Sequence, residues 1–200
     1  MTSILPSDTS RISLLPTGIG KPKTISAPHF IYRYATWSND LGTLVVVGSE
    51  SGSPVRFWVQ KTDGSPPKPV TPQGIDSGLL LTLNHVDYIG AYTADGSLRL
   101  YPLDGGQPKA VAGFAQSDSL VGSSSESDTV YVMPDAPAIP RLVEKLNIVT
   151  GRRRPFTSIL PADPAGLLVI GRPKITADEK RFVGTKFRQI STLYVASGLK

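Results

Sequence analysis

The sequence has no cysteine, little charge and no long apolar run. Without cysteine, disulfide scaffolds, thiolate metal sites and cysteine nucleophiles are excluded. Charged residues make up 18% of the 200 residues, and hydrophobic residues make up 40%. This balance argues against disorder, which needs few apolar residues and a high net charge. No run of about 20 apolar residues occurs, so we predict no membrane span. The N-terminal residues MTSILPSDTS lack the regions of a signal peptide.

What the chain does contain is turn residues and an uneven charge. The 19 Gly and 18 Pro residues predict many short elements and no long helix. Residues 1–140 carry 9 Lys/Arg and 12 Asp/Glu, whereas residues 141–200 carry 12 and 4. A basic segment can attract nucleic acid or acidic partners. Because no aromatic residues alternate with the basic ones as in single-strand binders, we interpret these residues as solvated strand ends and expect no nucleic-acid binding.

Five similar segments recur along the chain. Each begins with alternating apolar residues and then has a small or acidic residue followed by glycine, at Gly18, Gly64, Gly105, Gly151 and Gly198. These glycines lie 46, 41, 46 and 47 residues apart. Alternating runs on either side of such a pair predict a β-hairpin, with glycine at positive φ. Prolines in the outgoing strands predict that these strands lie at a sheet edge.

Two further apolar runs precede most of these hairpins, so one unit predicts four strands in about 45 residues. The first and innermost strands are expected at 30–37, 79–83, 119–122 and 167–175, and the doubly buried second strands at 44–47, 88–92, 129–133 and 182–187. One four-stranded sheet cannot cover both of its apolar faces, so neighbouring sheets must stack on it. We therefore predict an all-β fold, a β-propeller of four-stranded antiparallel blades.

The strand count favours an open arc with three full and two partial blades. We expect a disordered tail at 1–10 and one propeller domain at 11–200, with units at 11–26, 30–71, 79–112, 119–158 and 167–200. Equivalent buried strands should place Val46, Ile89, Tyr131 and Val183 in the same core layer. Both ends should expose apolar faces and allow self-association. The competing arrangement is a closed four-bladed ring, in which Leu14 or Ile25 lies on a strand paired with Leu193 and Val195.

The units resemble the divergent, WD-repeat-like blades of TolB-type propellers. The stretches that carry the resemblance are 56–71, 98–112, TGRRRPF at 150–156, PADPAG at 161–166 and the terminal LYVASGLK. The closest resemblance is to the C-terminal propeller of bacterial membrane-anchored Ser/Thr protein kinases. The family usually has a Ser-Pro-Asp-Gly turn before its buried strand, where this chain has 38–40 and 176–179 instead. The default compartment is the cytoplasm, and a kinase parent would imply an extracytoplasmic domain.

No catalytic, metal-binding or cofactor-binding motif is recognised. A nucleophile elbow needs G-x-S-x-G, but residues 48–52 read GSESG, with Glu50 at the serine position. The two histidines, His29 and His85, are each a lone candidate base or ligand, and we favour structural roles for both. The acidic residues lie singly in turns rather than in metal-ligand clusters. We therefore expect no enzyme activity, no cofactor and no metal.

The remaining candidates point to binding. Arg152, Arg153 and Arg154 follow a hairpin glycine and could contact a carboxylate or phosphate of a partner, although three solvated arginines in a turn are the favoured interpretation. Trp37 and Trp58 could line a binding surface, but packing between blades is favoured for both. Residues 117–128 contain six serines and three acidic residues and predict a flexible linker or an exposed loop.

We therefore predict a non-catalytic propeller scaffold that binds a protein or peptide. The alternative is the sensory or regulatory propeller of a Ser/Thr kinase or of a prolyl-oligopeptidase-like hydrolase, with the catalytic domain elsewhere in the parent protein.

Overall fold

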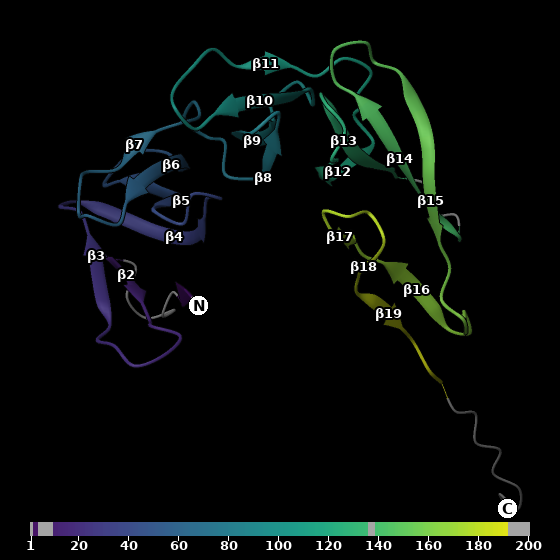
Figure 1. The fold of residues 1–200 in the computed structure, drawn as a ribbon, viewed down its shortest axis with the longest axis horizontal. Helices are drawn as coiled ribbons and strands as arrows, with labels where there is room; N and C mark the ends of the chain where they lie inside the picture. Colours follow the sequence, from purple (N-terminus) through teal and green to yellow (C-terminus); the bar gives the residue numbers. More distant parts are fainter. Residues whose placement is uncertain (1, 4–9, 136–138, 192–200) are drawn as a thin grey trace, which may run out of the picture.

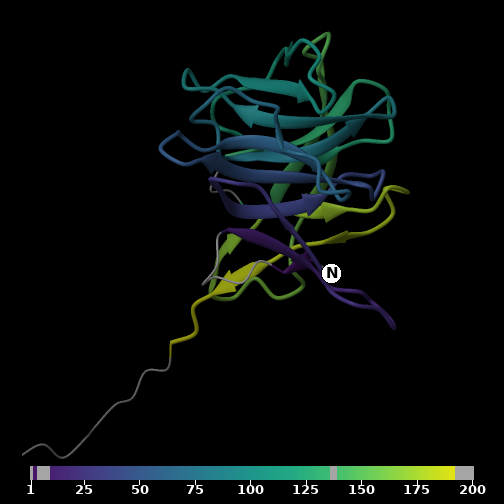
Figure 2. The same cartoon turned by 90° about the vertical axis from the view of Figure 1, so that its left-hand side faces the viewer.

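The computed structural model describes residues 2–3, 10–135 and 139–191. Within these residues every regular element is a β-strand, and no helix occurs. The sheets follow one another around an open arc (Figure 1), and successive sheets lie in layers (Figure 2). The prediction of an all-β, incomplete propeller is confirmed for the described residues.

Three sheets are complete blades of four antiparallel strands joined in sequence order. The first contains β4 (Phe30–Trp37), β5 (Thr43–Glu50), β6 (Arg56–Lys61) and β7 (Lys68–Pro69). The second contains β8 (Gly78–Leu83), β9 (Val86–Tyr92), β10 (Leu98–Pro102) and β11 (Lys109–Ala110). The third contains β12 (Asp118–Ser123), β13 (Thr129–Pro134), β14 (Arg141–Asn147) and β15 (Arg153–Ile159).

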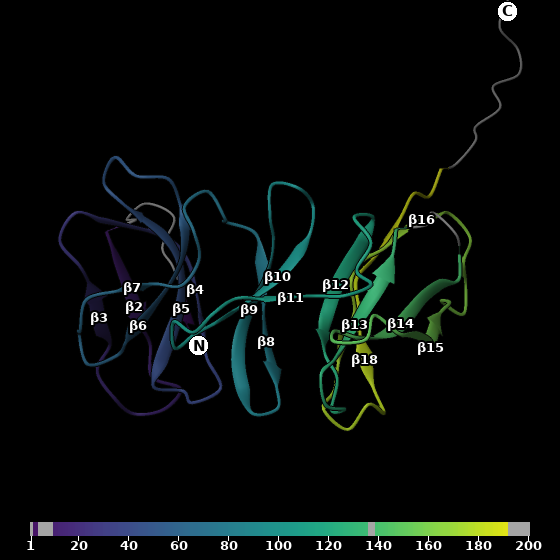
Figure 3. The same ribbon diagram turned by 90° about the horizontal axis from the view of Figure 1, so that it is seen from above.

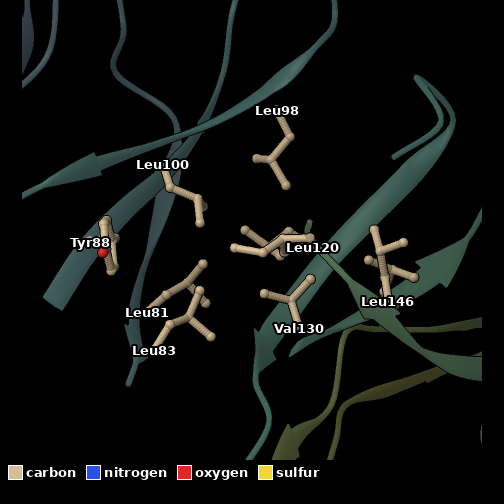
Figure 4. Close-up of a cluster of buried hydrophobic side chains, with 10 residues drawn as sticks. Leu81, Leu83, Tyr88, Leu98, Leu100, Leu120, Val130 and Leu146 are labelled. Carbon is tan, nitrogen blue, oxygen red and sulfur yellow. The ribbon is translucent and has the colours of Figure 1, made fainter. Parts of the chain in front are cut away.

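The second strand of each blade is buried because sheets pack on both of its faces. In β5, Leu44 and Val46 face the sheet before, whereas Val45 and Val47 face the sheet after. This alternation explains why the run is apolar at consecutive positions. The layer between the second and third blades is built in the same way from leucine and valine side chains, as Figure 4 shows for Leu98, Leu100 and Leu120.

Three of the four predicted core residues are buried, and one is not. Val46 and Ile89 are 0% exposed and Tyr131 is 2% exposed, but Val183 is 70% exposed. The prediction for Val183 is wrong because, among the described residues, no sheet packs outside the strand that carries it. The prediction that the equivalent residues of each blade face the same way is also wrong. Val46 and Ile89 face the preceding sheet, whereas Tyr131 faces the following one.

The hairpin glycines adopt the predicted conformation in the three complete blades. Gly64, Gly105 and Gly151 have φ of 94°, 87° and 71°, in loops at 62–67, 103–108 and 148–152 that are longer than a two-residue turn. Gly18 does not have positive φ, because the loop at 15–22 is long enough to reverse the chain without it. Gly198 lies outside the described residues.

The first sheet is a partial blade that covers one face of the first complete blade. It contains β1 (Thr2–Ser3), β2 (Arg11–Leu14) and β3 (Lys23–Ser26). Ile12 and Ile25 are paired across β2 and β3 and are buried against the first complete blade. Within the predicted tail at 1–10, the described residues Thr2 and Ser3 pair with β2.

The last sheet is a hairpin interrupted in the middle. Its first arm contains β16 (Leu167–Ile170) and β17 (Lys174–Ile175), and its second arm contains β18 (Phe182–Val183) and β19 (Lys186–Arg188). β16 pairs with β19, and β17 pairs with β18. Pro173 lies in the interruption and cannot donate to the ladder. The third strand predicted for this unit, and with it the ring-closing pairing to Leu193 and Val195, lies outside the described residues from 192 on.

Candidate functional site

Alternate turns of each blade lie along one edge of its sheet, and these edges together form what we call the hairpin rim. Its turns are 38–42, 62–67, 84–85, 103–108, 124–128, 148–152 and, in the terminal hairpin, 176–181. Because neighbouring strands are antiparallel, the first and third turns of a blade share an edge, and the second turn lies at the opposite edge. Figure 3 shows the strands of the blades running between these two edges.

Side-chain hydrogen bonds link the rim turns of neighbouring blades. The Asn39 backbone N–H and Nδ2 donate to Asp87 over 3.1 and 3.0 Å, which joins the first blade to the second. Asn84 Nδ2 donates to Asp128 over 2.9 Å, which joins the second blade to the third. Ser124 Oγ donates to Glu179 over 2.9 Å, which joins the third blade to the terminal hairpin. These bonds hold successive turns in fixed relative positions.

A cleft with a volume of about 1070 Å³, which we call the large cleft, lies on this rim between the first and second blades. Between these blades the apolar layer contains Val45, Val47 and Ile89. Toward the rim, polar side chains such as Asn39 and Thr82 replace it and line the cleft. These short polar side chains are hydrogen-bonded to one another and to Asp87, and they do not fill the space between two sheets as interlocking apolar ones do. The blades therefore separate at this rim.

The carboxylates of the cleft are held in the turns. Asp40 accepts hydrogen bonds from the Gly42 and Thr43 backbone N–H groups, each over 2.9 Å, and from the Ser38 and Thr43 hydroxyls. The Ser38 and Thr43 hydroxyl bonds are the main cause that lowers the pKa of Asp40 to about 2. Asp87 accepts from Thr82 Oγ1 over 2.7 Å in addition to Asn39. Asp40 is therefore a charged structural group of its turn at neutral pH, and Asp87 is held by its hydrogen bonds to both blades.

A second, smaller hollow of about 360 Å³ lies on the same rim at the third blade. It is lined by Glu126, Lys145, Arg152 and Arg154, among others. Lys145 is 3% exposed. Its Nζ contacts Glu126 over 2.8 Å and Glu179 over 2.6 Å. Hydrogen bonds from Arg154 and Lys145 lower the pKa of Glu126. Only Arg152 among these cations has no ion-pair partner in the described part of the chain.

The three consecutive arginines do not act as one cluster. Arg152 and Arg154 lie on the side of the hollow, and Arg154 contacts both carboxylate oxygens of Glu126. Arg153 points to the other side, where Nη2 contacts Asp118 over 3.0 Å and Nε contacts Glu144 over 2.9 Å. This separation follows because successive strand residues face opposite sides of a sheet. In the hollow, Arg152 can bind an anion directly, whereas Arg154 would have to exchange Glu126 for it.

The other sequence candidates occupy structural positions. His29 and His85 lie in turns with φ of 57° and 64°, and His85 also lines the large cleft. Trp58 is 2% exposed, and its indole N–H donates to the Gly48 carbonyl over 2.9 Å. Trp37 packs partly buried against the same apolar cluster. Glu50 is exposed at the end of β5.

Sequence reasoning did not identify the large cleft. Its polar wall combines residues from two blades, and Asn39 and Asp87 are 48 positions apart. The available signal was the turn at 38–40, which the family pattern marks as a position before a buried strand. Among the described residues, no group of three or more His, Asp or Glu side chains could hold a metal ion. No helix in this part of the chain could cross a membrane.

Comparisons with known proteins show similarity in fold. No family model matches the sequence, and no curated protein matches it. TolB from Acinetobacter baumannii superposes with a TM-score of 0.59 at 14% identity, over 92% of this chain and 45% of TolB. The chain thus spans less than half of the length of that protein.

Two peptidases give weaker superpositions. A puromycin-hydrolyzing peptidase from Mycobacterium tuberculosis has a TM-score of 0.46 at 16% identity, over 83% of this chain and 26% of the peptidase. A structure from a study of two prolyl endopeptidases has a TM-score of 0.48 at 16% identity, over 88% and 26%. The resemblance to kinase propellers stays a prediction. The similarity to TolB shows that this chain has a TolB-like β-propeller fold.

Proposed function

We propose that this chain is a non-catalytic interaction module and that it binds a protein or peptide partner at the hairpin rim. The observation that supports this proposal best is that both hollows, of about 1070 and 360 Å³, open at turns of the same rim. Turns fixed on a rigid stack of sheets are favourable positions for binding residues. A partner that spans the rim could contact both hollows at once.

Within this proposal, Arg152 is a contact for an anionic group of the partner. Its guanidinium lines the smaller hollow and has no ion-pair partner among the described residues. Arg153 and Arg154 already contact Asp118 and Glu126. An arginine can bind a carboxylate or phosphate through two parallel hydrogen bonds. We therefore assign the role of partner contact to Arg152 first and to its neighbours only secondarily.

Two matched surface variants test the proposal. Val86→Glu places a charge in the large cleft, where Val86 is 40% exposed. Ala94→Glu places the same charge in the exposed turn between β9 and β10, at the opposite edge. The parent and each variant are incubated with a lysate of the source cells. Mass spectrometry then quantifies the proteins that each of them retains.

For at least one captured protein, we expect Val86→Glu to retain about tenfold less than the parent does. Ala94→Glu should retain the same amount of that protein as the parent. If no retained protein depends on Val86, or if both variants lose the same proteins equally, the rim is not the binding surface and the proposal is wrong.

A further inference from the structure

The large cleft carries charges of both signs, and among the described residues it is its lysines that lack partners of their own. Asp40 accepts hydrogen bonds within its own turn, Asp87 accepts from Thr82 of its own hairpin and from Asn39 of the first blade, and Asp104 accepts the Gly106 N–H over 3.0 Å. In contrast, Lys61 and Lys68 line the cleft, are exposed, and have no ion-pair partner in the described part of the chain. Their ammonium groups remain available as hydrogen-bond donors for a ligand.

The two lysines lie on one face of the first blade. Val59 of β6 is the cross-strand partner of Lys68 of β7, so their side chains point to the same side of the sheet. Lys61 is two residues after Val59 in the same strand and therefore also points to that side. Val59 is thus flanked by two ammonium groups on the face that borders the cleft.

The remaining walls of the cleft are partly apolar. Val59 and Pro66 line it from the first blade, and Val86 and Leu103 line it from the second. The Leu103 N–H donates to the Asp87 carbonyl over 3.0 Å, which fixes the turn that carries this wall. A cleft of this size has room for several side chains of a bound ligand.

We propose that the cleft binds an extended peptide segment in which apolar side chains alternate with carboxylates. The apolar side chains would contact Val59, Val86 and Leu103, and the carboxylates would accept hydrogen bonds from Lys61 and Lys68. This inference rests on the proposed function, because it names the chemistry of the partner that the rim binds. Peptide is favoured over nucleic acid because, among the described residues, no Phe, Tyr or Trp side chain lines the cleft for base stacking.

Capped pentapeptides test the chemistry directly. We would titrate the ¹⁵N-labelled protein with acetyl-Glu-Leu-Glu-Leu-Glu-amide and record amide shifts, first at low salt and then at about 500 mM salt. Acetyl-Lys-Leu-Lys-Leu-Lys-amide tests the sign of the charge, and acetyl-Glu-Ser-Glu-Ser-Glu-amide tests the apolar contacts. A thymidine pentanucleotide tests nucleic acid.

The expected result is a set of shifts at Lys61, Lys68, Val86 and Leu103 with the Glu-Leu peptide. Binding should be weaker with the Glu-Ser peptide, absent with the Lys-Leu peptide, and weakened by salt. Lys61→Gln/Lys68→Gln should raise Kd about 2- to 30-fold, as expected for two exposed ion pairs.

The matched control is Lys21→Gln/Lys23→Gln, which removes the same charge from the first sheet and its loop. Both residues there are exposed and do not line the cleft. This control variant should bind the Glu-Leu peptide as the parent does.

Several results would overturn the inference. These are equal binding of the Lys-Leu peptide, shifts confined to the Arg152 hollow, tighter binding of the oligonucleotide, no shift with any probe, or a Kd unchanged by the Lys61/Lys68 double variant. The proposed function is judged separately by the retained proteins. If a partner depends on Val86 but the Glu-Leu peptide does not bind, the rim function stands and only the proposed chemistry of the partner is wrong.

Discussion

The ion pairs at Lys145 should hold the terminal hairpin on the third blade. Glu179 lies in the turn at 176–181. It accepts Lys145 Nζ over 2.6 Å, Ser124 Oγ over 2.9 Å and Ser125 Oγ over 2.7 Å. The Lys145 side chain is 4% exposed, and the Glu179 side chain is 21% exposed. Glu179→Gln keeps the shape of the side chain and removes its charge, so this single change tests the contact.

The expected cost lies below that of breaking an isolated buried pair. Removing one partner of such a pair costs about 3–5 kcal/mol. Here Lys145 keeps Glu126 at 2.8 Å, and Glu179 is partly solvated. We therefore expect a loss closer to that of one hydrogen bond to a charged group, about 1–3 kcal/mol. The loss should appear mainly as local opening, because a terminal repeat contacts only one neighbour.

Hydrogen exchange measured by mass spectrometry is the suitable assay. A loss of about 1–3 kcal/mol corresponds to exchange about 5- to 150-fold faster at 167–190. Exchange in the first blade should not change. Glu50→Gln is the control, because Glu50 is exposed and its side chain has no partner among the described residues. Unchanged exchange at 167–190 in Glu179→Gln would refute the reasoning.

The same contact predicts a pH dependence. Burial by itself raises the pKa of Glu179, but hydrogen bonds from Lys145 and the serines outweigh it and hold this pKa well below its usual range. A carboxyl with a lower pKa in the folded state contributes its full stability above the unfolded pKa of about 4.3. Protection of the terminal hairpin should therefore fall as pH decreases below about 4, and less so in Glu179→Gln.

Three further predictions follow from the core and the missing chemistry. Gly113→Ala should lower stability more than Gly52→Ala in urea unfolding. Both glycines have positive φ, but a Cβ at Gly113 would lie 2.5 Å from the Gly151 carbonyl, whereas one at Gly52 meets nothing within 4 Å; equal losses would contradict this reasoning. Val46→Asp should cost several kcal/mol, because Val46 is 0% exposed and the charge has no partner; a melting temperature within about two degrees of the parent would disprove the assignment. A fluorophosphonate probe should label no serine of the folded protein, and stoichiometric labelling at one site would show a hydrolase nucleophile.

The sequence predicts the blades because their signal is local and repeated. Apolar runs such as 44–47 alternate between two packed faces, and glycines such as Gly105 mark one loop in each unit. Strand alternation could also have separated Arg153 from its two neighbours, since period two places them on opposite sides. The sequence does not predict the side of the sheet to which the Tyr131 side chain points. The run 130–133 is apolar at every position, so the sequence does not show that Val130 and Val132 face the preceding sheet and Tyr131 the following one.

The two ends of the arc differ in a way that the strand count did not indicate. On the first sheet Ile12 and Ile25 point inward, and the outer face carries Arg11, Ser13 and Thr24, as in the polar cap of a repeat protein. Among the residues described at this end, the expected apolar face is therefore not found. The terminal hairpin exposes Val183 at 70% and Phe187 at 59%. Head-to-tail stacking of two copies would place these apolar side chains against polar ones, which disfavours that form of self-association.

The arrangement of the first two blades separates stability from binding. Away from the rim, Val45, Val47 and Ile89 form a continuous apolar layer, and substitutions there create cavities or bury polar groups. At the rim, the polar side chains that line the cleft are satisfied by hydrogen bonds to one another, as Asn39 of the first blade is by Asp87 of the second. A substitution at an exposed cleft residue such as Val86 changes what the cleft offers a partner without removing a buried contact of the stack. Substitutions at the rim can therefore alter which ligand is bound while the packing between the blades stays the same.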